Sequence, residues 1–403
     1  MTESSPMPET TYSKRSAYGR LSLFYIAFFA VYGISIPLWP RWLEHHVSLE
    51  YVGLVLGAAY WAKLIVVPLT SWIADVTGNR KIILICLAAV VIFGLALLGL
   101  VEQWWFYVII WGVAGATLSS GVPLSDGLTL RAHQSLGLDF GRARLWGSLS
   151  FIVFSVAVGW AADHYGINAI YTAILLTAGF LLVASLLLPG IHTPTEKGKS
   201  PFFKPLALPN FPLFLITVAL LLSTHAGLYG FSAIHWSQLG FSNAEITLFW
   251  VIGVVAEIGM FAISGRLLER FGAMPMIILC ALGGMLRWAM LGFLTSAVLI
   301  ACAQVLHAFT FALLYMSFIA YIGKRVPPAI AASAQGLYDS LGTGIFFGVF
   351  TIIAGWLYEH MGGAYCFYAM SAISGGGFVL ACILRTRVRR YERTQGATEI
   401  TTN

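Results

Sequence analysis

Six charged residues lie inside segments of the chain that are otherwise almost entirely apolar. They are Lys63, Asp126, Arg144, Glu257, Arg287 and Asp339. If these segments cross a membrane, each charge costs about 2.5–3.5 kcal/mol at mid-bilayer, so such residues usually pair with one another and mark a functional site. His225 and His307 add two groups that titrate near neutral pH. Buried carboxylates and imidazoles can exchange protons, and buried cations can bind an anionic solute.

The composition identifies an integral membrane protein. The 403 residues have a mean hydropathy of +0.82, 59% are hydrophobic and 10% are charged, whereas a soluble protein is about 25% charged. The first 19 residues are polar and contain no signal-peptide core, so we expect the first span to remain as an anchor. The five cysteines lie in apolar segments without CxxC spacing, which predicts neither disulfides nor a metal site, and no cofactor is expected.

Apolar runs bounded by charged or turn residues predict twelve membrane spans. We expect all of them to be helices, because a lipid-exposed backbone must satisfy its own hydrogen bonds. The spans are predicted near 21–42, 51–73, 82–101, 104–130, 143–162, 167–189, 212–235, 245–264, 274–294, 297–322, 330–357 and 365–384.

The basic residues predict the orientation of these spans. With the N-terminus in the cytoplasm, nearly all of the 23 Lys and Arg residues, Lys197 and Lys199 among them, fall on the cytoplasmic side, and Arg41 falls on the opposite side. The net charge of +6 therefore reflects this bias and does not indicate a nucleic-acid partner. The predicted organisation is a cytoplasmic tail (1–20), a six-helix bundle (21–189), a cytoplasmic linker (190–211), a second six-helix bundle (212–384) and a cytoplasmic tail (385–403).

The two halves of the chain contain similar segments at nearly constant spacing. SWIADVTGNRK (71–81) corresponds to SGRLLERFGAM (264–274), and GWAADHYG (159–166) corresponds to GWLYEHMG (355–362). This predicts a duplicated, pseudo-symmetric pair of bundles, an arrangement common in transporters whose substrate site lies near the midplane. The same spacing places Lys63 and Glu257 at equivalent positions, so we expect them to form a Lys–Glu position facing a central cavity, with Arg287 as an alternative partner of Glu257.

The loop after the second predicted span resembles a signature of the major facilitator superfamily, Gly-x-x-x-Asp-x-x-Gly-x-[Arg/Lys]-[Arg/Lys]. Asp75, Gly78, Arg80 and Lys81 match this pattern, and Ser71 replaces its leading Gly. The resemblance implies an all-α membrane protein with twelve transmembrane helices in two pseudo-symmetric six-helix bundles. It also implies that these four residues form a conformational latch and not a substrate site.

The segment DFGRARLWGS (139–148) is similar to the fifth-helix motif of the lactose permease group of oligosaccharide:proton symporters. That resemblance implies that Arg144 pairs with Asp126 and binds substrate, and that Glu257, Arg287 and His307 couple transport to protons. Thr310 stands where the sugar permeases have a proton-carrying Glu. This departure leaves the proton site open, and it keeps an uncoupled facilitator or an exporter as alternatives.

A more extensive resemblance is to the bacterial 3-phenylpropionic acid transporter subfamily. It rests on VYGISIPLWPRWL (31–43), LSDGL (124–128), RLWGS (144–148), HAGLYGFSAIHW (225–236), GVVAEIGMFA (253–262), LRWAMLG (286–292) and LHAFTF (306–311). It implies proton-coupled uptake of a small aromatic carboxylate by a monomer in the bacterial inner membrane, where lipid and protons are the other partners. The substrate-binding candidates are Asp126, Arg144, Lys63, His225, Tyr32 and Tyr229, and Asp339 is an additional intramembrane candidate.

Several alternatives to these roles remain open. Glu257 with Arg287, and Asp126 with Arg144, would also serve as structural ion pairs, and close helix packing in GLYDSLGTGIFFG would also accommodate Asp339 as a hydrogen-bonded residue. A sugar or nucleoside symporter on the same fold is a second candidate. An enzyme is not expected, because the chain contains neither a serine nucleophile elbow nor HExxH nor the Asp pair of intramembrane proteases.

Overall fold

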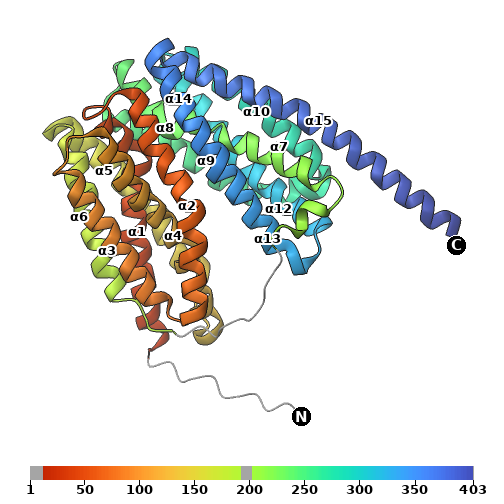
Figure 1. Ribbon diagram of the computed structural model, residues 1–403, viewed down its shortest axis with the longest axis horizontal. Coiled ribbons are helices and arrows are strands. Elements are labelled where there is room, and N and C mark those ends of the chain that lie inside the picture. Colours follow the sequence, from red (N-terminus) through yellow and green to blue (C-terminus); the bar gives the residue numbers. More distant parts are fainter. Residues whose placement is uncertain (1–11, 192–201, 403) are drawn as a thin grey trace. The chain divides into compact units, whose positions relative to one another are not determined.

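The structure is a computed structural model that describes residues 12–191 and 202–402, with side chains described up to residue 394. Every regular element in these residues is helical (Figure 1). In chain order the elements are α1 (Lys14–Leu43), α2 (Leu49–Thr77), α3 (Arg80–Leu98), α4 (Trp104–Leu136), α5 (Phe140–Tyr165), α6 (Asn168–Leu186), η1 (Lys204–Ala207), α7 (Phe211–Ser223), α8 (Ala226–Gln238), α9 (Asn243–Phe271), α10 (Ala273–Phe293), α11 (Ala297–Val305), η2 (Ala308–Leu313), α12 (Leu314–Arg325), η3 (Pro328–Ile330), α13 (Ala331–Tyr338), η4 (Asp339–Phe346), α14 (Phe347–Met361) and α15 (Gly363–Thr402).

The prediction of twelve spans is confirmed, because the described residues form 12 helical stretches that are long and apolar enough to cross a membrane. Three of these stretches are built from more than one element: α7 with α8, α11 to α12, and η3 to α14. Residues 1–11 of the predicted N-terminal tail, residues 192–201 of the predicted linker, with Lys197 and Lys199, and residue 403 lie outside the described residues.

Polar side chains define where several helices begin. Asn79 accepts a hydrogen bond from the backbone N–H of Ile82 at the start of α3, and Asp139 accepts one from Arg142 at the start of α5. A capping box of Ser242 and Glu245 opens α9. Such caps satisfy backbone N–H groups that the first helical turn leaves without partners. They set the starts of the helices that carry Arg80, Arg144 and Glu257.

The chain divides into two compact units. Unit 1 comprises the described parts of Met1–Trp39 and Ile65–Lys197, and unit 2 comprises Pro40–Leu64 and the described part of Gly198–Asn403. The first part of α2 therefore belongs to unit 2 and its last part to unit 1. The predicted domain boundaries, which assign all of α2 to the N-terminal bundle, stay a prediction.

In unit 1, α1 packs against α5 through small residues. The hydroxyls of Ser150 and Ser155 donate to the carbonyls of Ile26 and Gly33, at 2.7 and 2.5 Å. A Cβ atom on Gly33 would lie 2.6 Å from the carbonyl oxygen of Phe151, so only glycine permits this approach. Close contacts between small residues are a principal source of helix association in a membrane. Lipid tails are as apolar as a neighbouring helix, so the hydrophobic effect does not drive the helices together.

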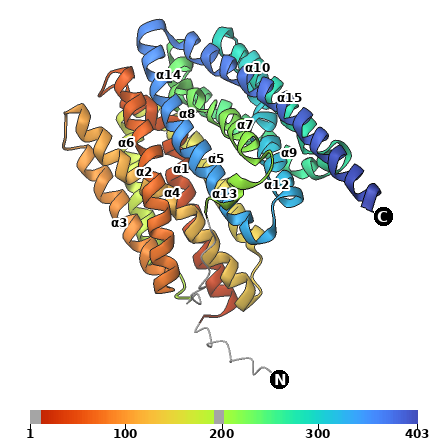
Figure 2. The ribbon, with the colours of Figure 1, turned by 45° about the vertical axis from the view of Figure 1, so that its right-hand side comes forward.

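In unit 2, α15 lies along α10, and it continues to Thr402 as one helix (Figures 1 and 2). The core between α7, α10, α12 and α13 combines aliphatic side chains with stacked aromatic rings: those of Phe214 and Tyr321 stack with centroids 3.6 Å apart, and those of Phe318 and Tyr338 stack at 3.9 Å. The first part of α2 packs on α14, where the backbones of Gly53 and Gly355 meet.

Three breaks in helical regularity were not predicted, and all lie in unit 2. Between α7 and α8, the side chains of Ser223, Thr224 and His225 each hydrogen-bond to a backbone carbonyl within four residues. Such bonds offer the backbone an alternative to regular helix. The two other breaks are the π-helices η2 and η4. Short π-helical turns frequently mark functional sites, and these two contain or adjoin His307, Thr310 and Asp339.

Substituting Gly33 tests the contact between α1 and α5. We expect Gly33→Ala to lower the free energy of unfolding of the detergent-purified protein by about 1–3 kcal/mol, because the new methyl group would collide with the backbone of α5. Gly19→Ala, on the same helix, is the matched control, since no atom lies within 4 Å of a Cβ placed there. A thermal unfolding experiment in which both variants shift equally would contradict the proposed contact.

Candidate functional site

Arg287 is the centre of a buried polar network in unit 2. Its side chain projects from α10 and has no exposed surface. One terminal nitrogen, Nη2, donates to Oε1 of Gln304 at 2.7 Å, and the other, Nη1, donates to Oγ1 of Thr310 at 2.8 Å. Gln304 in turn donates to the carbonyl of Phe249 on α9 at 3.1 Å. Neutral oxygen atoms therefore solvate a guanidinium that water cannot reach.

His307 connects this guanidinium to Glu257. Nη1 of Arg287 lies 3.0 Å from Nδ1 of His307, and Nε2 of His307 lies 3.4 Å from Oε2 of Glu257. Arginine can only donate, so Nδ1 must accept, and the imidazole carries its proton on Nε2. The Nε2–H group then donates to the carboxylate. The imidazole is thus oriented as a neutral link between a cation on α10 and an anion on α9.

A second branch of the network passes through Thr310 to His225. Nδ1 of His225 lies 2.8 Å from the carbonyl of Leu222, so it must donate there, and Nε2 is left to accept from the hydroxyl of Thr310 at 3.2 Å. Thr310 therefore receives a hydrogen bond from Arg287 and donates one to His225. Thr310 thus links Arg287 to His225 within the network.

The expected partners of Glu257 need correction. Its contact is with His307 and not directly with Arg287, because the imidazole occupies the space between them. The repeat also suggested Lys63, but Lys63 contacts Asp339 instead, with Nζ 3.3 Å from Oδ1. Equivalent positions in a duplicated sequence predict similar depth, and they do not predict which way each side chain points.

Lys63, Asp339 and Thr343 form a separate cluster in unit 2. Lys63 lies on the first part of α2, and the other two lie in η4. The ammonium group also donates to the hydroxyl of Thr343, and that hydroxyl is hydrogen-bonded to the Asp339 carboxylate. Asp339, the additional intramembrane candidate, therefore pairs with Lys63. Lys63 is the residue that the repeat suggested as the partner of Glu257.

Asp126 and Arg144 contact each other in unit 1, as predicted. Nε of Arg144, on α5, lies 3.5 Å from Oδ1 of Asp126, on α4. The hydroxyl of Tyr25, on α1, donates to the same carboxylate oxygen at 2.7 Å. Both charged side chains are about one-third exposed, at 29% and 34%. This pair is thus bound on one side and accessible on the other.

Aromatic rings of α1 lie against the guanidinium of Arg144. Its Cζ lies 4.1 Å from the ring centroid of Phe29 and 5.4 Å from that of Tyr25. Tyr32 extends the same aromatic row, with its ring 5.8 Å from that of Phe29. Tyr229, the other tyrosine predicted to bind substrate, lies in unit 2, where its ring contacts Trp250 at 5.1 Å. Tyr32 therefore lies close to Arg144, and Tyr229 belongs to the surroundings of His225.

The predicted latch forms a turn between α2 and α3. Gly78 adopts a φ of 64°, which glycine tolerates without strain, and Nη2 of Arg80 lies 3.3 Å from Oδ1 of Asp75. The guanidinium of Arg80 also occupies the space that a Cβ of Gly127 would need. Gly127 directly follows Asp126 in α4. Lys81, the last residue of the predicted latch, lies in the first turn of α3. Through Arg80, the latch thus contacts α4, the helix that carries Asp126.

Three members of these clusters, Gln304, Thr343 and Phe29, were not predicted from the sequence. Gln304, His307 and Thr310 recur every third residue, a spacing that places side chains on one side of a helix and gave a usable signal. Thr343 follows Asp339 by four residues and gave the same kind of signal. Gln304 and Thr343 carry no charge, and uncharged polar residues are common in membrane helices, so this signal is weak.

A double-mutant cycle tests the Lys63–Asp339 contact. We expect Lys63→Met and Asp339→Asn each to lower thermal stability by about 1–3 kcal/mol, because each leaves one charge without its partner, and the double variant to recover part of the loss. The measurement is thermal unfolding of the purified single and double variants. Strictly additive losses would show that the two charges do not interact.

Similar sequences are known among curated transporters. The chain is 29% identical over 352 residues to the "Probable 3-phenylpropionic acid transporter" of Escherichia coli (strain K12), which covers 85% of this chain and 91% of the relative. It is 27% identical over 383 residues to the maltose permease of Geobacillus stearothermophilus, with 93% and 95% of the two chains covered. The chain is thus similar to transporters of different solutes over most of its length.

The chain also resembles solved transporter structures and matches a family model. A mutant of the nucleoside transporter NupG superposes with a TM-score of 0.81 at 17% identity, covering 92% of this chain and 99% of that one. This likeness establishes the fold, with its two pseudo-symmetric six-helix bundles. The model described as "MFS_1 like family" matches residues 18–369, and the protein is therefore a membrane transporter that belongs to this family of the major facilitator superfamily.

Proposed function

We propose that the protein is a proton-coupled symporter that takes up a small aromatic carboxylate such as 3-phenylpropionate by alternating access. The observation that carries this proposal is the position of the Arg144 guanidinium, which Asp126 holds on one side and the Phe29 ring covers on another. A cation beside aromatic rings offers a charge for the carboxylate and an apolar surface for the ring of such a solute. The similarity to the probable 3-phenylpropionic acid transporter supports the same substrate class.

Arg144 has the donors that carboxylate binding requires. Its contact with Asp126 uses Nε, so the two terminal nitrogens remain for a bidentate pair with a substrate carboxylate. Tyr25 donates a hydrogen bond to Asp126 and so stabilises its charge next to the arginine. An incoming carboxylate would share the guanidinium with Asp126, and Tyr32 would extend the apolar surface along α1. Lys63 is a weaker candidate for this role, because Asp339 and Thr343 already surround its ammonium group.

Glu257 is the proposed proton-binding group. Its side chain is 20% exposed, while His307, which donates to it, is almost completely buried. A proton that reaches Glu257 removes the negative charge opposite the imidazole, and through the imidazole it alters the surroundings of Arg287. Because Arg287 contacts residues of α11 and η2, this change of charge would be transmitted to several helices of unit 2. His225 and Thr310 would adjust with it.

A sugar or nucleoside is the second substrate class. The Asp126 carboxylate is one-third exposed and can accept hydrogen bonds from hydroxyl groups. The maltose permease and the nucleoside permease NupG of Escherichia coli, which is 22% identical over 338 residues, support this alternative. Counterflow measured in proteoliposomes with 3-phenylpropionate, maltose and uridine separates these classes. A facilitator is distinguished from a symporter by alkalinisation of the medium on addition of substrate.

We further propose that the protein functions as a monomer in the bacterial inner membrane, with both termini in the cytoplasm. The bias of basic residues toward one set of loops supports this orientation. The turn at Asp75, Gly78, Arg80 and Lys81 would then lie on the cytoplasmic side. There it would act as a latch that Arg80 connects to α4 beside Gly127.

Glu257→Gln tests proton coupling. We expect the variant to lose uptake driven by a proton gradient and to retain counterflow, because exchange of substrate needs no net proton movement whereas accumulation does. Transport is measured in proteoliposomes with an imposed pH gradient. Glu102→Gln, which neutralises an exposed carboxylate between α3 and α4, is the control and is expected to behave as wild type. Gradient-driven accumulation at the wild-type level in Glu257→Gln would exclude Glu257 as the coupling site.

Arg144→Lys tests recognition of the carboxylate. The charge is retained, but the planar, bidentate fork is lost, so we expect the KM for 3-phenylpropionate to rise about tenfold. Arg142→Lys is the matched control, because Arg142 lies on the same helix, pairs with Asp139 and is highly exposed. Initial uptake rates measured over a range of 3-phenylpropionate concentrations give the KM of each variant. Equal changes in the two variants would indicate that Arg144 has no specific contact with substrate.

A further inference from the structure

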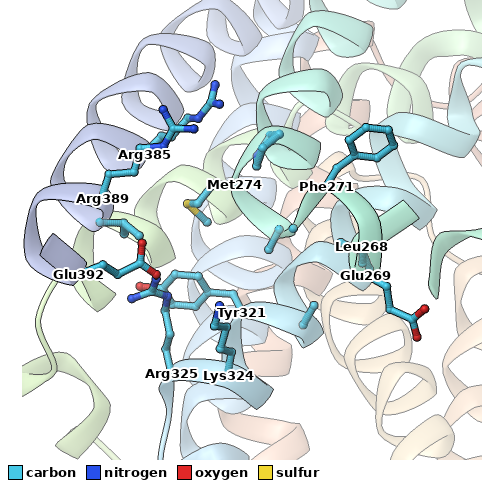
Figure 3. Close-up of a pocket in the computed structure, with 15 residues that line it drawn as sticks. Leu268, Glu269, Phe271, Met274, Tyr321, Lys324, Arg325, Arg385, Arg389 and Glu392 are labelled. Carbon is cyan, nitrogen blue, oxygen red and sulfur yellow. The ribbon is translucent and has the colours of Figure 1, made fainter. Parts of the chain in front are cut away.

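A second set of basic residues surrounds a cavity of about 490 Å³ at one end of unit 2 (Figure 3). Its walls come from the end of α9, the start of α10, the end of α12 and residues 385–392 of α15. Lys324, Arg325, Arg385 and Arg389 line it, together with two acidic residues, Glu269 and Glu392. The cavity therefore has an excess of positive charge that neither the proposed substrate site nor the proposed proton site uses.

The acidic residues neutralise only part of this charge. Arg325 pairs with Glu392 and lies over the ring of Tyr321, with Cζ 5.5 Å from the ring centroid. Glu269 points away from the arginines of α15 (Figure 3). Nε of Arg385 is buried without a hydrogen-bond partner among the described residues. Arg385, Arg389 and Lys324 thus remain to bind an external anion.

The start of α10 adds backbone donors to the same cavity. Gly272 turns the chain between α9 and α10 with a φ of 78°. The first turn of α10 contains no acidic residue, and no side chain caps it. Backbone N–H groups at the start of a helix are left without partners and carry a partial positive charge that attracts anions such as phosphate. Ala273 and Met274, which begin this turn, supply such N–H groups at the cavity wall; the N–H of Gly272 already donates to the carbonyl of Leu268, and Pro275 has none.

The remaining walls are apolar and lie where membrane spans end. Leu268, Met274 and Val388 contribute aliphatic surface, and the neighbouring Phe271 is 48% exposed. Phe271, Ala273 and Arg325 are the terminal residues of three of the spans. A site at the ends of membrane helices that is basic on one side and apolar on the other suits an amphiphile better than a freely soluble anion. Basic pockets between membrane helices bind anionic lipid headgroups in this way.

We propose that this cavity binds the phosphate-bearing headgroup of an anionic phospholipid, such as phosphatidylglycerol. Arg385, Arg389 and Lys324, with the first turn of α10, hold the phosphate, and the aliphatic residues contact the glycerol and the upper part of the acyl chains. On the predicted orientation the site faces the cytoplasmic leaflet. The bound lipid would hold the long helix α15 against α10 and α12 at the membrane surface.

The experiment compares two double variants that remove the same charge from the same helix. Arg385→Gln with Arg389→Gln changes residues that line the cavity, and Arg387→Gln with Arg390→Gln changes exposed arginines outside it. Native mass spectrometry of the delipidated full-length protein, titrated with phosphatidylglycerol, measures lipid binding. We expect the first pair to weaken binding at least about tenfold and the second pair to weaken it less than about twofold.

Two controls, a zwitterionic lipid and inorganic phosphate, accompany this comparison. Phosphatidylcholine, which has a phosphate but no net charge, is expected to bind wild-type protein more weakly than phosphatidylglycerol. Equal losses in the two double variants would indicate attraction to surface charge alone and would overturn the proposal, as would the absence of any loss. Displacement of the lipid by a comparable concentration of inorganic phosphate would instead indicate a soluble-anion site. If the first double variant does not fold, Arg389→Gln and Lys324→Gln singly, both exposed residues, provide the same comparison.

Discussion

The burial of one guanidinium constrains the C-terminal unit more than any other interaction. Arg287 has no exposed surface, and moving an unpartnered charge out of water costs several kcal/mol even after the protein relaxes. The compensation comes from three elements: α11 supplies Gln304, η2, with His307 directly before it, supplies Thr310, and α9 supplies the carbonyl bonded to Gln304 and the carboxylate of Glu257 bonded to His307. These helices must therefore be rotated about their axes so that their polar groups reach the guanidinium of Arg287.

This constraint gives a physical reason for the irregular helices of unit 2. His307 and Thr310 reach Arg287 from the start of a π-helical turn, and His225 reaches Thr310 from the break between α7 and α8. Asp339, likewise, opens the π-helix that also carries Thr343, and both contact Lys63. A π-turn changes the direction of every following side chain on a helix. Such turns therefore occur where polar groups must meet at a particular angle inside an apolar bundle.

The Asp126–Arg144 pair of unit 1 also consists of charges that need polar partners inside an apolar bundle, but it is less buried than Arg287. Asp126 and Arg144 satisfy each other only at one edge, and they depend on Tyr25 and Phe29 for the remaining contacts. A partly exposed pair can exchange a partner for a solute at lower cost than the enclosed network around Arg287. This difference agrees with the proposed division of roles, in which unit 1 would recognise the anion and unit 2 would respond to the proton.

The sequence by itself determined the membrane class, the twelve spans, the family resemblance and the identity of nearly all the charged residues that matter. Each of these depends on composition, length or a local motif, which chain order preserves. The sequence also predicted the Asp126–Arg144 contact, through the similarity to a known motif. Only the tertiary structure decided that His307 stands between Glu257 and Arg287, that Lys63 contacts Asp339, and that Thr310 is a hydrogen-bonding link between Arg287 and His225. The physical reason is that a pairing depends on how each helix is rotated about its axis and shifted along it. A helix that is apolar on all sides carries little information in its sequence about that rotation.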